Sequence, residues 1–167
     1  MIADSARFRK EIYDHRVYDF GIPLKKNMIV LDLGAHRGIF SEYVSVLSKK
    51  IYQVEPLLEN VLYLQEHTRE NIRIFHQGIA GKTERRNFYI SPSDGASTFL
   101  STDRVSFLPV LCQTLDDFCE EQKITHIDLM KIDVEGLEYE IFSQGFDSSS
   151  RKIDAIVGEF HGTEIRD

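Results

Sequence analysis

The amino-acid sequence predicts an α/β protein whose core is a doubly wound, mainly parallel sheet. Short, almost continuously apolar segments, typical of strands covered on both faces, alternate with segments whose apolar residues recur at helical spacing. The expected core strands are residues 28–33, 51–56, 72–80, 127–134 and 153–161. Because a helix separates most consecutive strands, the connections are expected to be crossovers that leave neighbouring strands parallel.

The helices and the middle of the chain follow from the same patterns. Helices are expected at residues 39–48, 57–71, 115–122 and 137–146. The alternation breaks where residues 86–91 and 105–115 both look like strands with no helix between them. They are expected to form a hairpin or a pair of edge strands inserted into the core. The polar loop 91–104 between them is either a lid over a site or an ordinary surface loop.

Length and composition indicate one domain. A chain of 167 residues can bury a core of its own, and no linker divides it. We expect residues 1–27 to supply a lead-in helix (5–18) and a linker, and residues 28–161 to form the core, with inserted strands near 86–113.

Charge and hydropathy exclude several classes of partner. No apolar run approaches the ~20 residues that span a bilayer, and the start of the chain lacks the apolar core of a signal peptide. A cytoplasmic protein that does not bind membranes is therefore expected. The formal net charge of −7 argues against nonspecific binding to nucleic acid.

The most informative stretch is IVLDLGAHRGIFSEY (29–43), which predicts a strand, a glycine turn and a helix. Its pattern is D-x-G-x-x-x-G, formed by Asp32, Gly34 and Gly38, with Ala35 and His36 inside the turn. It lacks the middle glycine of G-x-G-x-x-G, which lets the backbone approach a pyrophosphate. Asp32 would also repel a diphosphate and would favour a cationic or zwitterionic group. A tight turn without a ligand is the alternative interpretation.

A second acid points to a nucleoside. Glu55 ends the second core strand about 20 residues after the turn, where doubly wound dinucleotide-binding folds place a carboxylate on the ribose hydroxyls. The alternative is a solvent-facing side chain before Pro56. Together these features describe a ligand with an adenosine, free ribose hydroxyls, no diphosphate and a charged polar tail. S-adenosylmethionine meets all of these requirements, whereas NAD meets only the ribose requirement well.

The motifs VLDLGAHRGIFSEY, VEP, TLDDF, IDLMKIDVEGLEYEIF and IVGEFH occur in an order that closely resembles the FkbM family of S-adenosylmethionine-dependent methyltransferases. The resemblance runs from about residue 28 to 161, and KIDVEG (131–136) is its most specific part. It implies a Rossmann-like fold of seven strands and O-methylation of hydroxyls on sugars or polyketide-type products. The cofactor positions that it implies are Asp32, Gly34, Ala35, His36, Gly38 and Glu55, with the loop from Gly78 to Ala80 near the adenine. His36 stands where many relatives have asparagine.

The end of the chain differs from the pattern of the family that it resembles. Class I methyltransferases finish with a sixth and a seventh strand, but only six residues follow His161. Either the two middle strands take part of that role, or the chain is a short or truncated member that lacks the final strand hairpin. A truncated sheet would expose an edge strand, which favours pairing with a second copy of the chain.

Three residues after the last two core strands are expected to carry the chemistry. Methyl transfer to an alcohol needs an in-line approach and removal of a proton, so an acid or a histidine near the methyl group is required. The candidates are Asp133, Glu135 and His161. These residues could hold Mg²⁺ together with Glu159, but nothing in their spacing demands a metal, and none is predicted.

Three functions compete at this point. The first is an active O-methyltransferase that acts on a small-molecule or glycan hydroxyl. The second is a module that binds the cofactor without catalysis. The third, a nicotinamide-dependent oxidoreductase, is disfavoured by the absent middle glycine and by Asp32.

Overall fold

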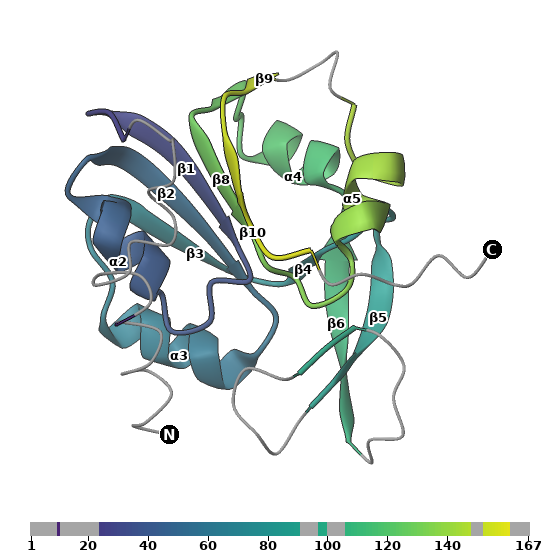
Figure 1. The fold of residues 1–167 in the computed structure, drawn as a ribbon. Helices are drawn as coiled ribbons and strands as arrows, with labels where there is room; N and C mark the ends of the chain where they lie inside the picture. Colours follow the sequence, from purple (N-terminus) through teal and green to yellow (C-terminus); the bar gives the residue numbers. More distant parts are fainter. Residues whose placement is uncertain (1–9, 11–23, 91–96, 100–105, 148–151, 161–167) are drawn as a thin grey trace.

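The computed structural model describes residues 24–90, 97–99, 106–147 and 152–160, together with Lys10 (Figure 1). The expected lead-in helix at 5–18, His161 and most of the loop 91–104 lie outside the described residues. No helix in the described parts of the chain is long and apolar enough to cross a membrane.

A five-stranded parallel sheet forms the core, as the sequence predicts. Its spatial order is β10-β8-β1-β2-β3, and every neighbouring pair is parallel. The strands are β1 (Met28–Leu33), β2 (Ser48–Glu55), β3 (Ile72–His76), β8 (Leu129–Ile132) and β10 (Ile156–Gly158). Strand β1 lies at the centre of this order and is buried along most of its length, which explains its nearly continuous apolar sequence.

Helices cover both faces of the sheet. They are α2 (Ile39–Ser45), α3 (Leu58–Glu66), α4 (Leu115–Glu121) and α5 (Glu138–Gln144). Alternate residues of β1 enter two separate apolar clusters: Met28 and Val30 pack with α2, whereas Leu31 and Leu33 belong to the cluster that includes α4 and α5. The doubly wound α/β class is therefore confirmed.

Three of the predicted strands are divided in the structure. The segment 72–80 gives β3 in the main sheet and then β4 (Gly78–Ile79), which pairs with β6 in a second sheet. A Cβ on Gly78 would lie 2.7 Å from the Cys112 sulfur, so glycine permits this close approach. In the same way, β7 (His126–Ile127) precedes β8, and β9 (Lys152–Ile153) precedes β10; β7 and β9 pair with each other.

The inserted strands pair as a sheet of their own. β5 (Glu84–Tyr89) and β6 (Phe107–Gln113) run antiparallel, with Glu84 opposite Cys112 and Tyr89 opposite Phe107. The expectation of two paired strands outside the α/β alternation is thus confirmed. With β4 they form a three-stranded sheet in the order β4-β6-β5.

Two helices are shorter than their sequence patterns suggest. The segment 39–48 is helical only to Ser45, because β2 already begins at Ser48. The segment 57–71 is helical only to Glu66. By contrast, α4 begins as expected, since the Thr114 side chain accepts a hydrogen bond from the Asp117 amide and caps the helix.

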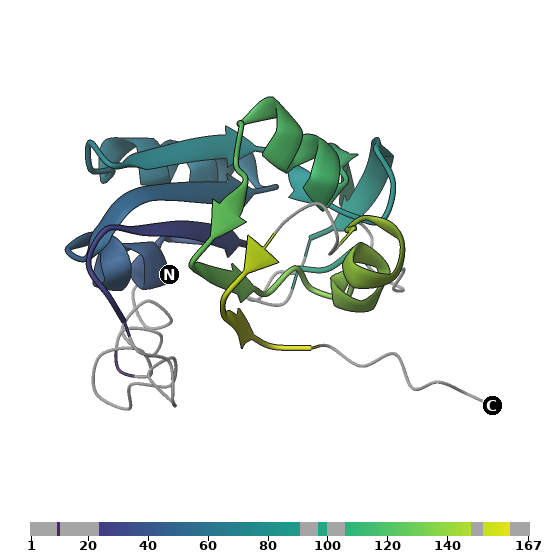
Figure 2. The same ribbon diagram turned by 90° about the horizontal axis from the view of Figure 1, so that it is seen from above.

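Strand β10 lies at the margin of the main sheet (Figure 2). Its Ile156 side chain is exposed, and so is Phe160, which follows the strand. Pairing of this edge with a second copy of the chain stays a prediction.

Candidate cofactor-binding site

The predicted residues after β1, β2 and β8 converge because parallel strands end at the same edge of a sheet. The Gly34 and Ala35 amides both donate to the Val54 carbonyl near the end of β2, at 2.9 and 3.1 Å. On the other side, the Asp133 amide donates to the Leu33 carbonyl at 3.0 Å. The glycine turn is therefore held between the ends of its two neighbouring strands.

The turn itself depends on three residues in the left-handed region. Gly34 has φ 77°, His36 has φ 50° and Gly38 has φ 72°. His36 carries a Cβ and adopts this conformation less readily than glycine. Its amide donates to Glu55 Oε2 at 2.7 Å, and this bond stabilises the strained residue.

Glu55 is a buried acceptor for the chain's own donors. The residue is 3% exposed, which excludes the solvent-facing alternative. Besides His36, the Leu57 amide donates to its Oε1 at 2.9 Å, and the Asn60 amide nitrogen donates to the same oxygen at 3.1 Å. Burial raises the pKa of the Glu55 carboxyl, and the hydrogen bonds from Leu57, Asn60 and His36 oppose that rise. Glu55 therefore fixes the turn, and its contact with a ribose stays a prediction.

Asp32 is fully buried beside a lysine that the sequence reasoning missed. Ser41 Oγ donates to Asp32 Oδ2 at 2.6 Å, while Asp32 Oδ1 lies 3.7 Å from Lys131 Nζ. The same ammonium lies 3.5 Å from Asp133 Oδ2 and donates to the Gly34 carbonyl at 2.9 Å. Burial raises the pKa of Asp32, and the Lys131 charge opposes that rise. The cation expected near Asp32 is thus partly supplied by the chain itself.

Two carboxylate oxygens at this edge have no hydrogen-bond donor. Asp32 Oδ1 and Asp133 Oδ1 are both buried, and neither has a hydrogen-bond partner among the described residues. Buried polar atoms are rarely left in this state, because the lost hydration is not replaced. They indicate a missing donor, such as the ammonium group of an amino-acid ligand.

The loop after β8 is shaped by a second buried acid. Glu138 is fully buried, and its carboxylate accepts from the Val134 amide at 3.2 Å and from the Gly136 amide at 3.2 and 3.3 Å. Glu135 has φ 58°, and its carbonyl accepts from Thr98 Oγ1 at 2.7 Å. The middle segment 97–99 therefore contacts the loop that carries Asp133 and Glu135.

Ala80 lies apart from these contacts. It has no exposed surface, and its amide donates to the Gln113 carbonyl at 2.9 Å. A contact between its neighbourhood and an adenine stays a prediction, and the same holds for the catalytic role of His161, which lies outside the described residues.

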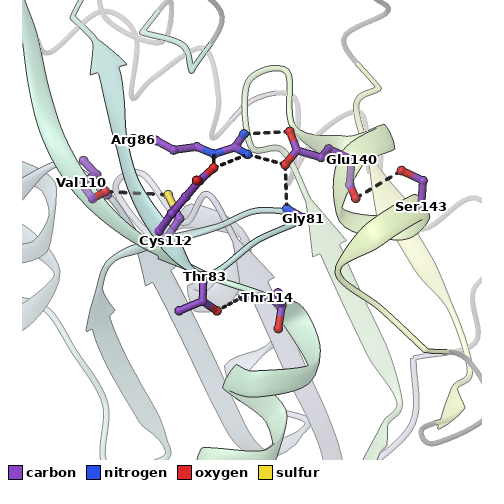
Figure 3. A network of polar contacts seen from close by, with 9 residues as sticks. Gly81, Thr83, Arg86, Val110, Cys112, Thr114, Glu140 and Ser143 are labelled. Atoms are coloured by element: carbon purple, nitrogen blue, oxygen red, sulfur yellow. Dashed lines mark hydrogen bonds and ion pairs between the residues drawn. The ribbon is translucent and has the colours of Figure 1, made fainter.

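An ion pair ties the inserted sheet to α5 and to the loop after β4 (Figure 3). Arg86 on β5 makes a bidentate contact with Glu140, with its Nη1 donating to Oε2 at 2.7 Å. Glu140 Oε1 also accepts from the Gly81 amide at 3.1 Å. Nearby, burial raises the pKa of the Cys112 thiol to about 11, so this cysteine stays a neutral thiol.

We expect Arg86→Lys to destabilise the fold by about 0.5–1.5 kcal/mol, because lysine keeps the charge but loses the planar fork. The expected loss of stability is modest because the side chains of Arg86 and Glu140 are about a quarter exposed, at 22% and 25%. Urea unfolding would measure the change. Arg85→Lys on the same strand is the matched control, because Arg85 is exposed; equal losses for the two variants would contradict the role of the fork.

A second charged group lies at the opposite, amino-terminal end of the sheet. His126, Asp128 and Asp154 bring their ligand atoms within 4.8 Å of one another, as a metal site requires. However, Lys25 Nζ lies 2.7 Å from Asp128 and 3.2 Å from Asp154. Lys152 Nζ also lies 3.1 Å from Asp154, so two ammonium groups balance the two carboxylate charges.

Comparisons with known proteins bear on the family and the fold of the chain. A family model described as the methyltransferase FkbM domain matches residues 32–166. Among solved structures, the chain is similar to methyltransferase FkbM from Methylobacillus flagellatus KT, with 16% identity and a TM-score of 0.53 over 81% of this chain and 32% of that one. It is also similar to a SAM-dependent methyltransferase from Aquifex aeolicus, with 16% identity and a TM-score of 0.40 over 74% of this chain and 49% of that one. No curated protein matches the sequence.

Proposed function

The chain belongs to the FkbM methyltransferase family, and from this premise we propose that it is an S-adenosylmethionine-dependent O-methyltransferase. Its acceptor is a hydroxyl of a carbohydrate or of another small molecule. The observation that carries the proposal is the pair of buried carboxylate oxygens, on Asp32 and Asp133, that lack donors beside the glycine turn.

The residues present fit the amino-acid part of this cofactor. The free oxygens of Asp32 and Asp133 can accept hydrogen bonds from an ammonium group, which carries three donors and a positive charge. A diphosphate would meet the same two carboxylates and be repelled. The site therefore favours a zwitterionic ligand over NAD.

Glu55 fits the ribose in a more limited way than a free carboxylate would. A carboxylate offers about four acceptor positions, and the chain's own donors on His36, Leu57 and Asn60 use three of them. One position remains for a ribose hydroxyl, so we assign Glu55 a single hydrogen bond to the ribose.

The bound cofactor supplies an electrophilic methyl group, and the chain supplies position and a base. The glycine turn and the β8 loop bind the cofactor at the carboxyl edge, which holds the methyl group where an acceptor oxygen can approach in line. Asp133, Glu135 and His161 are the candidates that take the hydroxyl proton, a contribution on the order of 10²- to 10⁴-fold in rate. Asp133 also faces Lys131 and the turn, which places it beside the proposed position of the cofactor's ammonium group.

An inactive cofactor-binding module is the second candidate. The chain spans about a third of the FkbM structure and about half of the Aquifex protein. In the larger proteins, residues outside the matched part can contribute to an acceptor pocket. Cofactor binding and methyl transfer must therefore be measured separately.

Calorimetric titration of the chain with S-adenosylmethionine, S-adenosylhomocysteine and NAD tests the cofactor assignment. We expect the first two to bind and NAD to give no heat of binding at the same concentrations. If neither S-adenosylmethionine nor S-adenosylhomocysteine binds, the methyltransferase proposal is wrong.

Transfer is then measured with a radiolabelled methyl group and a panel of sugars and other hydroxylated acceptors. Incorporation that depends on the acceptor supports the O-methyltransferase. Binding without transfer to any member of the panel favours the inactive module. Asp133→Asn is the matched variant, and transfer at the wild-type rate would remove Asp133 from the list of bases.

A further inference from the structure

Lys131 is a charged residue in the middle of a buried strand. It is one of four buried residues of β8, and its side chain is only 8% exposed. The parallel register of β1 and β8 places it opposite Asp32. One ammonium group therefore faces Asp32 from across the sheet, Asp133 from its own chain segment, and the carbonyl of Gly34.

Asp32, Asp133 and Lys131 form a cluster whose charges do not cancel. Two carboxylates and one ammonium sum to −1, and each carboxylate keeps one buried oxygen without a hydrogen bond. A cationic group of the ligand would bring the sum to zero and satisfy both oxygens. Without Lys131 the fully buried Asp32 would lose the ammonium that lies 3.7 Å from it and would still face the charge of Asp133, and a buried carboxyl in that situation retains a proton rather than ionise.

We propose that Lys131 is a positioning residue that keeps the buried Asp32 ionised and open in the free protein, so that the site formed with Asp133 receives the cofactor's amino group without exchanging a proton. The inference rests on the proposed function, because it assumes a ligand with an amino-acid tail. It assigns Lys131 a role in binding beyond that of a structural counter-ion.

Among the described residues, the cluster has contacts from the β8 side and from α2. Asp32 meets Lys131 and Asp133 from the β8 side and the Ser41 hydroxyl from α2. Across the turn, Glu55 accepts from the His36 backbone amide. His36 and Glu55 are the same in wild type and in every variant proposed below.

Proton exchange on ligand binding distinguishes a positioning role of Lys131 from that of a structural counter-ion. S-adenosylhomocysteine is titrated calorimetrically at pH 6.5 in two buffers that differ in ionisation enthalpy. Wild type is expected to bind with no net proton exchange. Lys131→Met is expected to release between about 0.5 and 1 proton, because the ligand's ammonium displaces the proton held by Asp32. The affinity of this variant should then rise as pH rises, approaching tenfold per pH unit below the pKa of its Asp32.

Two control variants and one control ligand isolate the effect. Lys131→Arg keeps the charge and is expected to bind without proton release. The double variant Asp32→Asn with Lys131→Met keeps the sum at −1 with a single carboxylate, and it is also expected to release no proton. 5′-Methylthioadenosine, which lacks the amino-acid tail, should bind wild type and Lys131→Met with the same affinity.

The outcomes distinguish this inference from the proposed function. If neither adenosine ligand binds wild type, the proposed function fails. If S-adenosylhomocysteine binds and Lys131→Met shows no proton release, Lys131 is only a structural counter-ion. The wild-type measurement stands even if Lys131→Met does not fold, because release of half a proton or more by wild type would overturn the proposal.

Discussion

Replacing Gly34 with alanine is expected to leave little folded protein, with a loss of more than about 4 kcal/mol in the free energy of unfolding, which is the range of exceptional substitutions. A Cβ at this position would lie 1.8 Å from the Asp133 carbonyl oxygen and 2.9 Å from its carbonyl carbon. The φ of 77° adds a further cost of about 1–2 kcal/mol for any residue with a side chain. Urea unfolding followed by circular dichroism would measure the loss.

Gly38→Ala is the matched control for this prediction. Its φ of 72° imposes the same conformational cost. The added Cβ, however, would meet the ends of two side chains, Leu64 Cδ2 at 2.6 Å and Gln53 Nε2 at 2.9 Å. Side-chain ends can move, whereas the Asp133 carbonyl is fixed by the β1–β8 pairing. We expect a loss of about 1–3 kcal/mol, and equal losses at the two glycines would refute the argument from backbone contact.

The contrast between these glycines shows what the sequence could predict. The spacing of Asp32, Gly34 and Gly38 predicts the strand, the turn and the helix, because each of those signals is local. The sequence does not show that Gly34 lies against Asp133, about 100 residues away. That contact follows from the pairing of β1 with β8, which is a property of the whole sheet.

The strand boundaries that differ from the prediction also depend on pairing between residues that are distant in the sequence. The sequence of residues 72–80 predicts one strand with its exit loop, yet β3 pairs with β2 and β4 pairs with β6. A strand changes sheet where a new partner becomes available, and the partner here is an inserted strand more than 30 residues further along the chain. Periodicity along one segment carries no information about such a partner.

The site was predictable where a topological rule applies. Ligands of doubly wound sheets bind beyond the carboxyl ends of the strands, and this rule correctly brings the segments of Asp32, Glu55 and Asp133 to one edge. It could not find Lys131 or Glu138, because both act through burial. A lysine inside the apolar run LMKID was the available signal, since a buried charge needs a partner. The register of β1 and β8, which places Lys131 opposite Asp32, identifies that partner.

Replacing Glu55 is expected to weaken both the turn and the ribose contact. Glu55→Ala would leave the His36 and Leu57 amides and the Asn60 side chain without their acceptor. Each buried donor that loses its partner costs about 1–3 kcal/mol, with partial recovery through water, so we expect a loss of roughly 2–4 kcal/mol in unfolding free energy. Glu55→Gln is the milder variant, because an amide keeps one acceptor oxygen while its NH₂ opposes at least one donor. Urea unfolding compares both variants with wild type.

The ribose contact is separated from the turn by a cycle of two proteins and two ligands. Wild type and Glu55→Gln are each titrated with 5′-methylthioadenosine and with its 2′,3′-dideoxy analogue, which lacks both ribose hydroxyls. A hydrogen bond to a charged carboxylate contributes about 1.5–3 kcal/mol, so Glu55→Gln should weaken the hydroxylated ligand by roughly 10- to 100-fold more than the analogue. Equal weakening of both ligands would mean that Glu55 serves the turn alone. Because these ligands lack an amino-acid tail, the cycle is independent of Lys131, and the two ends of the cofactor are tested by residues on opposite sides of the glycine turn.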